Sequence, residues 1–134
     1  MSKVVLLIGI SCTAWVALGS TVGIGSAVAD ESTPVVVDCG GHSLVEPQSI
    51  VFTCADATWA VDKIIWTSWS VDGAMGTGIE YLRSCVPNCA QGSATYSPVT
   101  ISLTGAAAPY FRHTDAVVTN ENTGRSENSS LPHG

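Results

Sequence analysis

The chain has 134 residues, of which 46% are hydrophobic, and eleven acidic residues stand against five basic ones, for a net charge of −6 at pH 7. This length corresponds to one domain. The acidic balance argues against nucleic acids and anionic membrane surfaces as partners, because both are polyanions. The acids are scattered singly along the chain, which indicates a solvated surface rather than a cation-binding cluster.

The N-terminal segment, residues 1–29, is typical of a signal peptide. Lys3 supplies a positive start, an apolar run extends from Val4 to about Gly25, and small residues occupy the two recognition positions of Ala27-Val28-Ala29. Cleavage before Asp30 predicts a secreted, extracellular protein. The apolar run is also long enough to span a bilayer, so an uncleaved membrane anchor is the alternative.

Residues 30–118 are predicted to form strands rather than helices. Apolar and polar residues alternate with a period of two, most clearly at Val99, Ile101 and Leu103, and turn residues recur at short intervals. The predicted strands span residues 35–39, 50–54, 63–70, 74–84, 99–104 and 110–119. This pattern predicts an all-β domain, a small antiparallel β-sandwich of the Ig-like or a similar kind.

The C-terminal segment, residues 119–134, is predicted to be a disordered tail. It consists mainly of Asn, Glu, Ser, Thr and Gly, and no apolar period continues after Val118. The remaining folding unit is small, and its hydrophobic core alone gives a thin stability margin. Disulfides are a common way to stabilise such a unit.

Four cysteines remain once Cys12 has left with the leader, and thiols outside the cytosol tend to oxidise. They allow three pairings. We favour Cys39–Cys54, because both lie on the more apolar faces of predicted strands, and Cys85–Cys89, because a Pro-Asn turn separates them. Closing loops of these lengths contributes about 3 and about 2 kcal/mol, respectively.

Two functional interpretations of the cysteines compete with structural disulfides. Cys85 and Cys89 could form a redox pair, but thioredoxin-like sites have two intervening residues and open a helix, whereas Pro87 lies here in a strand context. A zinc site would need His42 or His113, and no ligand spacing links either histidine to the cysteines. We therefore expect no metal and no cofactor.

Aromatic residues are the candidate ligand contacts. Trp66 and Trp69 are three residues apart, so on a regular strand they point to opposite faces and one of them belongs to the core. An exposed Trp69, together with Trp59 or Tyr81, could stack on a sugar ring. The alternative is that all these tryptophans fill the core, and a bulge that puts Trp66 and Trp69 on one side favours it.

No catalytic constellation is recognisable. Gly41-His42-Ser43 does not match the Gly-x-Ser-x-Gly motif, and His113, with Asp115 nearby, is expected at the surface close to the tail. Three aspartates could supply a carboxylate pair for glycoside cleavage, namely Asp56, Asp62 and Asp72. Asp56 is instead expected to cap a turn, and Asp72 to lie in a hairpin turn.

The order of the motifs resembles a family of small secreted proteins from high-GC Gram-positive bacteria. The matching motifs are Cys39-Gly40, Pro47-x-x-Ile50, Cys54-Ala55-Asp56, Trp66-x-x-Trp69, Gly76-x-Gly78 and Cys85-x-Pro87-x-Cys89-Ala90-x-Gly92. They span about residues 38–111, and Arg83-Ser84 stands where the family pattern has an Asn-Asp-like pair. The resemblance implies secretion and fold, but no mechanism.

Together these patterns predict a secreted, non-catalytic binding or surface-interaction module. Its expected ligand is a cell-envelope polysaccharide or another protein. A small extracellular hydrolase with an unrecognised site is the alternative.

Overall fold

The computed structural model describes residues 33–133, and within them all regular structure is β. The predicted signal peptide lies outside the described residues. The strands are β1 (Val36–Val37), β2 (Ser43–Leu44), β3 (Ser49–Val51), β4 (Trp59–Ser70), β5 (Gly73–Arg83), β6 (Ala94–Thr104), β7 (Asp115–Asn120) and β8 (Ser126–Ser130). In this part of the chain no helix is long and apolar enough to cross a membrane.

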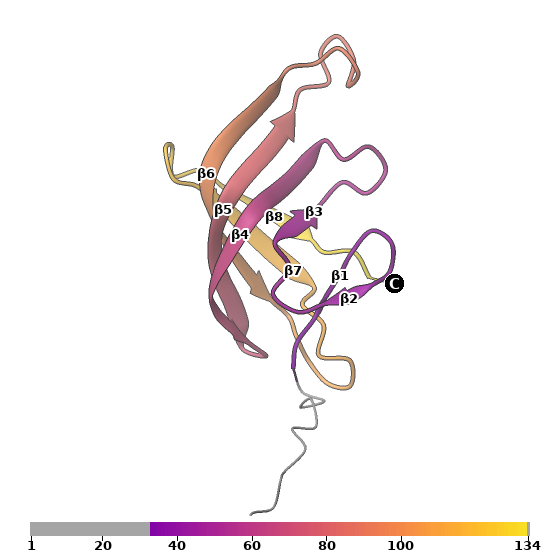
Figure 1. The fold of residues 1–134 in the computed structure, drawn as a ribbon, viewed down its shortest axis with the longest axis vertical. Coiled ribbons are helices and arrows are strands. Elements are labelled where there is room, and N and C mark those ends of the chain that lie inside the picture. Colours follow the sequence, from indigo (N-terminus) through magenta and orange to yellow (C-terminus); the bar gives the residue numbers. More distant parts are fainter. Residues whose placement is uncertain (1–32, 134) are drawn as a thin grey trace, which may run out of the picture.

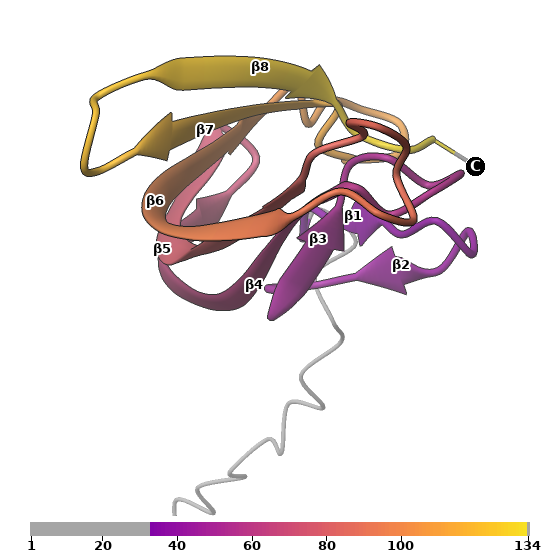
Figure 2. The same cartoon turned by 90° about the horizontal axis from the view of Figure 1, so that it is seen from above.

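Six strands form one antiparallel sheet in chain order, from β3 at one edge to β8 at the other. The sheet curls strongly, so that β3 and β4 lie opposite β7 and β8, and the small β1–β2 pair lies at the open side (Figures 1 and 2). The predicted all-β, antiparallel architecture with two disulfides is confirmed. Consecutive strands pair as neighbours throughout the large sheet, which makes it a meander.

The core is built on the inward-facing residues of β6. Val99, Ile101 and Leu103 each expose 0% of their surface, because alternate side chains of a strand point to one face and the inner face of the curled sheet excludes water. The other buried core residues are Val36, Ile50, Phe52, Val61, Ile64, Ala74, Ala116, Val118 and Leu131. The sequence pattern that was clearest for β6 therefore identifies the centre of the core.

β4 approaches β5 closely because two glycines of β5 lack a Cβ. A Cβ at Gly76 would lie 2.8 Å from the Ile65 carbonyl oxygen, and one at Gly78 would lie 2.8 Å from Val61 Cγ1. Between Trp66 and Ser68 the register of β4 shifts. This irregularity puts Trp66 and Trp69 on the same side, with ring centroids 4.8 Å apart.

The segment around β1 covers part of the inner face. Val35 donates its N–H to the Phe111 carbonyl and accepts the His113 N–H, both at 2.9 Å, which forms an isolated parallel bridge to the segment before β7. Trp69 donates its indole N–H to the Pro34 carbonyl at 2.9 Å. These bonds hold the start of the described chain over the core.

Both predicted disulfides are present. Cys39–Cys54 joins the loop after β1 to the loop after β3, and Cys85–Cys89 closes the loop between β5 and β6. The first link therefore ties the covering segment to the large sheet. The second restrains a loop whose residue Val86 is 79% exposed.

The prediction of a disordered tail is wrong for residues 119–133. β7 runs to Asn120, and β8 pairs with it from Asp115↔Ser130 to Thr119↔Ser126. Leu131 follows, is 1% exposed, and donates its N–H to the Thr114 carbonyl at 2.7 Å. The segment folds because main-chain pairing and one buried leucine suffice, although most of its other side chains are polar.

Replacing Leu131 with Ala should lower the free energy of unfolding by about 2–5 kcal/mol, because it opens a cavity in the core. Urea unfolding followed by tryptophan fluorescence measures this change. Ser130→Ala, in the exposed adjacent position, is the control and should change stability by less than about 0.5 kcal/mol. Equal stability of Leu131→Ala and wild type would contradict the assignment of this residue to the core.

His113 is buried, with 0% exposure, contrary to its expected surface position. Its ring meets Trp69 edge to face, with centroids 5.3 Å apart, and neither ring nitrogen has a hydrogen-bond partner among the described residues. Burial lowers the pKa of His113 below the ordinary 6.5, and the main chain of Thr104 partly opposes this. Folding therefore disfavours the charged form of this imidazole.

Stability should fall as the pH drops below about 6.5, because the unfolded chain then binds a proton that the folded His113 does not. Chemical unfolding between about pH 7.5 and pH 5 tests this above the range in which carboxylates titrate. His113→Leu should flatten the profile, because the buried titrating group is then removed. An identical slope in wild type and His113→Leu would refute the assignment.

Candidate binding groove

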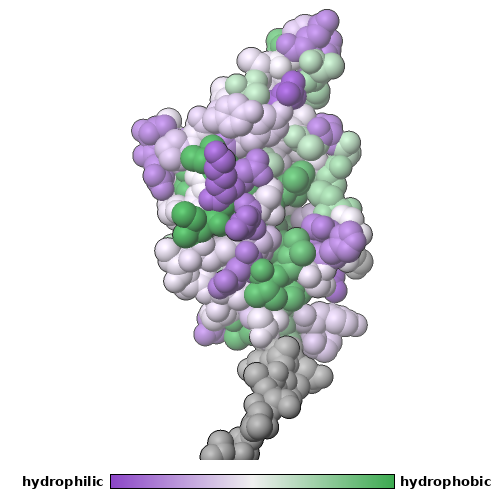
Figure 3. Space-filling model, viewed as in Figure 1, coloured by the Kyte–Doolittle hydropathy of each residue, from purple (hydrophilic) through white to green (hydrophobic). Residues whose placement is uncertain are grey.

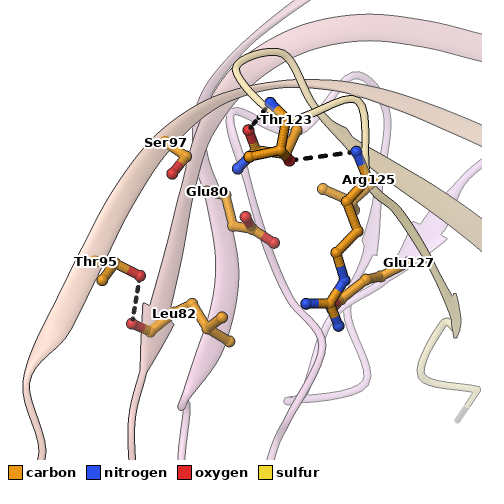
Figure 4. A pocket seen from close by; sticks show the side chains of 9 residues that line it. Glu80, Leu82, Thr95, Ser97, Thr123, Arg125 and Glu127 are labelled. Carbon is orange, nitrogen blue, oxygen red and sulfur yellow. Dashed lines mark hydrogen bonds and ion pairs between the residues drawn. The ribbon is translucent and has the colours of Figure 1, made fainter.

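The inner face of the sheet changes from apolar to polar toward one end of its strands. A pocket of about 230 Å³ opens there, which is smaller than the usual range for small-molecule sites of about 300–1,000 Å³. Its lining comes from β5, β6, β7, β8 and the turn between the last two (Figure 4). The lining residues are Glu80, Leu82, Thr95, Ser97, Val118, Asn120, Thr123, Arg125 and Glu127. We call this pocket the groove.

The groove continues the same face that carries the core. Ser97 lies two residues before Val99 on β6, and Asn120 lies two residues after Val118 on β7, so each points to the same side as its buried neighbour. Glu80 pairs with Ser97 across β5 and β6. The polar side chains therefore occupy inward positions that the segment around β1 does not reach.

Charged groups in the groove are held by specific partners. Arg125 Nη2 lies 2.6 Å from Glu127 Oε1. The half-buried Glu80 accepts the indole N–H of Trp59 at Oε1, over 2.8 Å. These contacts fix the directions in which one guanidinium and two carboxylates face the groove.

Several neutral groups in the groove remain available to a ligand. The side-chain hydroxyl of Ser97 makes no hydrogen bond within residues 33–133, so it can donate to a ligand or accept from one. Asn120 uses its Oδ1 to accept the N–H groups of Asn122 and Thr123, at 3.0 and 3.1 Å, which leaves its NH₂ group for a ligand. These groups can donate hydrogen bonds to, and accept them from, polar groups of a ligand.

Of the predicted aromatic contacts, Trp59 lies closest to the groove and Trp69 lies away from it. Trp59 is half-buried beside Phe52, with ring centroids 4.5 Å apart, and its indole contacts Glu80. Trp69 packs against the core between Trp66 and His113. The three predicted contacts do not form one site.

Tyr81 lies on the opposite, outer face of β5. It pairs with Tyr96 of β6, with ring centroids 5.5 Å apart, and Tyr96 is 68% exposed. Arg83 donates its Nε–H to the Tyr81 hydroxyl at 2.6 Å. This pair forms a second, separate aromatic surface.

The residues considered for catalysis or metal binding have other roles. His42 contacts Asp38, whose pKa is held below its usual value chiefly by the main-chain N–H of His42. Asp56 caps a turn as predicted, and the hydroxyl of Thr58 lowers its pKa. Asp56 also lies near Cys85 and Cys89, but those sulfurs are bonded to each other and offer no thiolate to a metal.

The groove residues were not among the predicted contacts, although a signal for them exists in the sequence. On β6, Thr95 and Ser97 are at alternate positions from the buried Val99 and point to the same face as it does. On β5, Glu80 and Leu82 stand in the same relation to Gly78. Polar residues at strand positions that point to the same face as core residues indicate that part of this face is accessible to solvent. Glu127 gave no such signal, because its segment was not expected to be a strand.

Comparisons with known proteins give no relative for this chain. No family model, curated protein or solved structure matches it. The resemblance to small secreted bacterial proteins therefore stays a prediction.

Substitutions on β6 should affect stability differently in the groove and in the core. Ser97→Ala should change the free energy of unfolding by less than about 0.5 kcal/mol, whereas Ile101→Ala on the same face of β6 should cost about 2–5 kcal/mol. Urea unfolding of the two variants beside wild type measures both values. A similar loss of stability in both variants would show that Ser97 is packed in the core and that the groove is not accessible to solvent.

Proposed function

We propose that this protein is a secreted, non-catalytic binding module that holds part of a saccharide chain in the groove. The observation that carries the proposal is the polar lining of an uncovered inner sheet face. Hydroxyl, amide, carboxylate and guanidinium groups converge there, and only Leu82 and Val118 lack a polar side chain. Such groups match the alternating donors and acceptors of sugar hydroxyls.

The extracellular address is supported by the covalent framework. Two disulfides are typical of proteins that fold in oxidising compartments. The expected signal peptide and the acidic composition agree with export and with a neutral or cationic partner. Cell-envelope polysaccharide therefore remains our expected class of ligand.

A protein partner is less well supported. On the face that carries β2, β3 and β4, hydrophobic side chains form separate patches among hydrophilic ones (Figure 3). The outer surface at Tyr81 and Tyr96 is the best remaining place for a protein contact. It serves as the comparison surface in the experiment below.

A glycoside hydrolase is the second candidate function, because Glu80 and Glu127 line the same groove. Two carboxyl groups on either side of a glycosidic bond are what such an enzyme needs. Here, however, each carboxylate is bound to a group of the protein, namely Trp59 or Arg125. This arrangement favours binding over proton transfer.

Filling the groove should abolish saccharide binding. Ser97→Tyr places a large side chain into the groove, whereas Tyr96→Ser removes an aromatic ring from the opposite face of the same strand. On a glycan array and in wall-polysaccharide pull-downs, Ser97→Tyr should bind at least about tenfold more weakly than wild type. Tyr96→Ser should bind as wild type does.

Circular dichroism establishes that both variants are folded before binding is compared. Loss of binding in Tyr96→Ser alone would move the site to the outer face and overturn the proposal. Release of new reducing ends during incubation, removed by Glu80→Gln, would support the hydrolase instead.

A further inference from the structure

We propose that the groove selects saccharides that carry a free amino group, with the Glu80 carboxylate binding the ammonium. This inference rests on the proposed function and names the class of sugar. It follows from the charges in the groove, from the hydrogen bonds that Glu80 makes, and from the neutral groups around it.

The groove carries one negative charge that no cation of the described chain pairs with. Three charged residues line it, and two of them, Arg125 and Glu127, neutralise each other at 2.6 Å. Glu80 forms no ion pair within residues 33–133, and its one hydrogen bond comes from the neutral indole of Trp59. That bond orients the carboxylate without cancelling its charge.

The position of Glu80 strengthens its effect on a ligand. The side chain is half-buried on the inner face, where charges are screened less than at an open surface. Oε1 accepts the Trp59 N–H, so Oε2 is left without a partner in the described chain. In Figure 4 the carboxylate points into the groove, toward the space that Arg125 and Glu127 enclose from the other side.

The groups beside Glu80 fit the rest of an amino sugar. Ser97, directly across the strand pair, and the NH₂ group of Asn120 can bind the hydroxyls that flank an amine. An N-acetylated sugar offers no positive charge to Glu80, and a uronic acid would bring a second carboxylate beside it. The expected order of affinity is therefore amino sugar, then N-acetylated sugar, then anionic sugar.

A lysine side chain of a peptide also carries an ammonium, but the groove fits a peptide less well. Its lining offers only Leu82 and Val118 as apolar contacts, and a peptide needs apolar pockets or an open strand edge. The strands that form the groove walls at Glu80 and Ser97 are paired on both sides. A lysine-rich peptide therefore belongs in the experiment as a competing ligand.

Isothermal titration calorimetry at about pH 6, where amines are protonated, tests the inference. The probes are tetramers of glucosamine, N-acetylglucosamine and galacturonic acid, and tetralysine. Wild type should bind the glucosamine tetramer about tenfold more tightly than the N-acetylated one. Binding should weaken with added salt.

Two variants with the same change in charge distinguish direct binding at Glu80 from the general attraction of a cation to an acidic protein. Glu80→Gln keeps an acceptor for the Trp59 indole and should remove the preference for the amine. Glu121→Gln changes a carboxylate that lies outside the groove lining and should keep the preference. Unfolding curves of both variants show that each remains folded.

The outcomes distinguish this inference from the proposed function. Equal affinity for the glucosamine and N-acetylglucosamine tetramers in both wild type and Glu80→Gln would overturn amine selection and leave saccharide binding intact. Tetralysine binding as tight as the glucosamine tetramer would overturn the assignment to a sugar. Binding of no saccharide at all would overturn the proposed function as well.

Discussion

One sheet must bury its inner face against something, and the segment that covers it here is short. The hydrogen bonds of Val35 to Phe111 and His113 fasten this segment over the half of the sheet where Ile101 and Leu103 lie. The Cys39–Cys54 link ties its far end to the loop after β3. The strands of the large sheet extend beyond this segment, and inward residues such as Glu80 and Ser97 there stay partly accessible to water.

This division of one face explains both stability and the candidate site. Where the cover lies, the inward residues of β6 are apolar and fully buried. Beyond it, at Ser97 and Thr95, the same strand carries hydroxyl groups, which cost nothing to leave solvated. The core thus positions the polar groups of the groove, where we propose that the ligand binds.

Local sequence patterns predict core strands and disulfide pairs correctly where the pattern itself results from a contact in the folded protein. The alternation of Val99, Ile101 and Leu103 predicted a core strand, and the apolar faces around Cys39 and Cys54 predicted their pairing; both are confirmed. Sequence patterns do not predict whether a segment is ordered when main-chain hydrogen bonds, rather than apolar side chains, hold it in place. The last strand has few apolar side chains, so composition predicted disorder, yet pairing with β7 and one buried leucine fix it.

The groove was unpredictable for a related reason. The residues that line it are polar side chains at inward-pointing strand positions. Whether such a position is buried depends on how much of the inner face the segment around β1 covers. That coverage is set by contacts between segments far apart in the sequence. Glu80 and Glu127 are far apart in the chain and come together only because the sheet curls through four strands. The irregular register of β4, which puts Trp69 on the same side as Trp66, likewise shows only in the pairing of β4 with β5.

We propose that this protein binds its ligand at the groove on the inner face of the sheet and not at the outer aromatic surface. Mapping amide and indole NMR shifts during titration with a glucosamine oligomer tests it most directly. We expect shifts concentrated at Glu80, Ser97 and Asn120 and at the Trp59 indole N–H. Shifts concentrated around Tyr81 and Tyr96, with the groove amides unchanged, would contradict it.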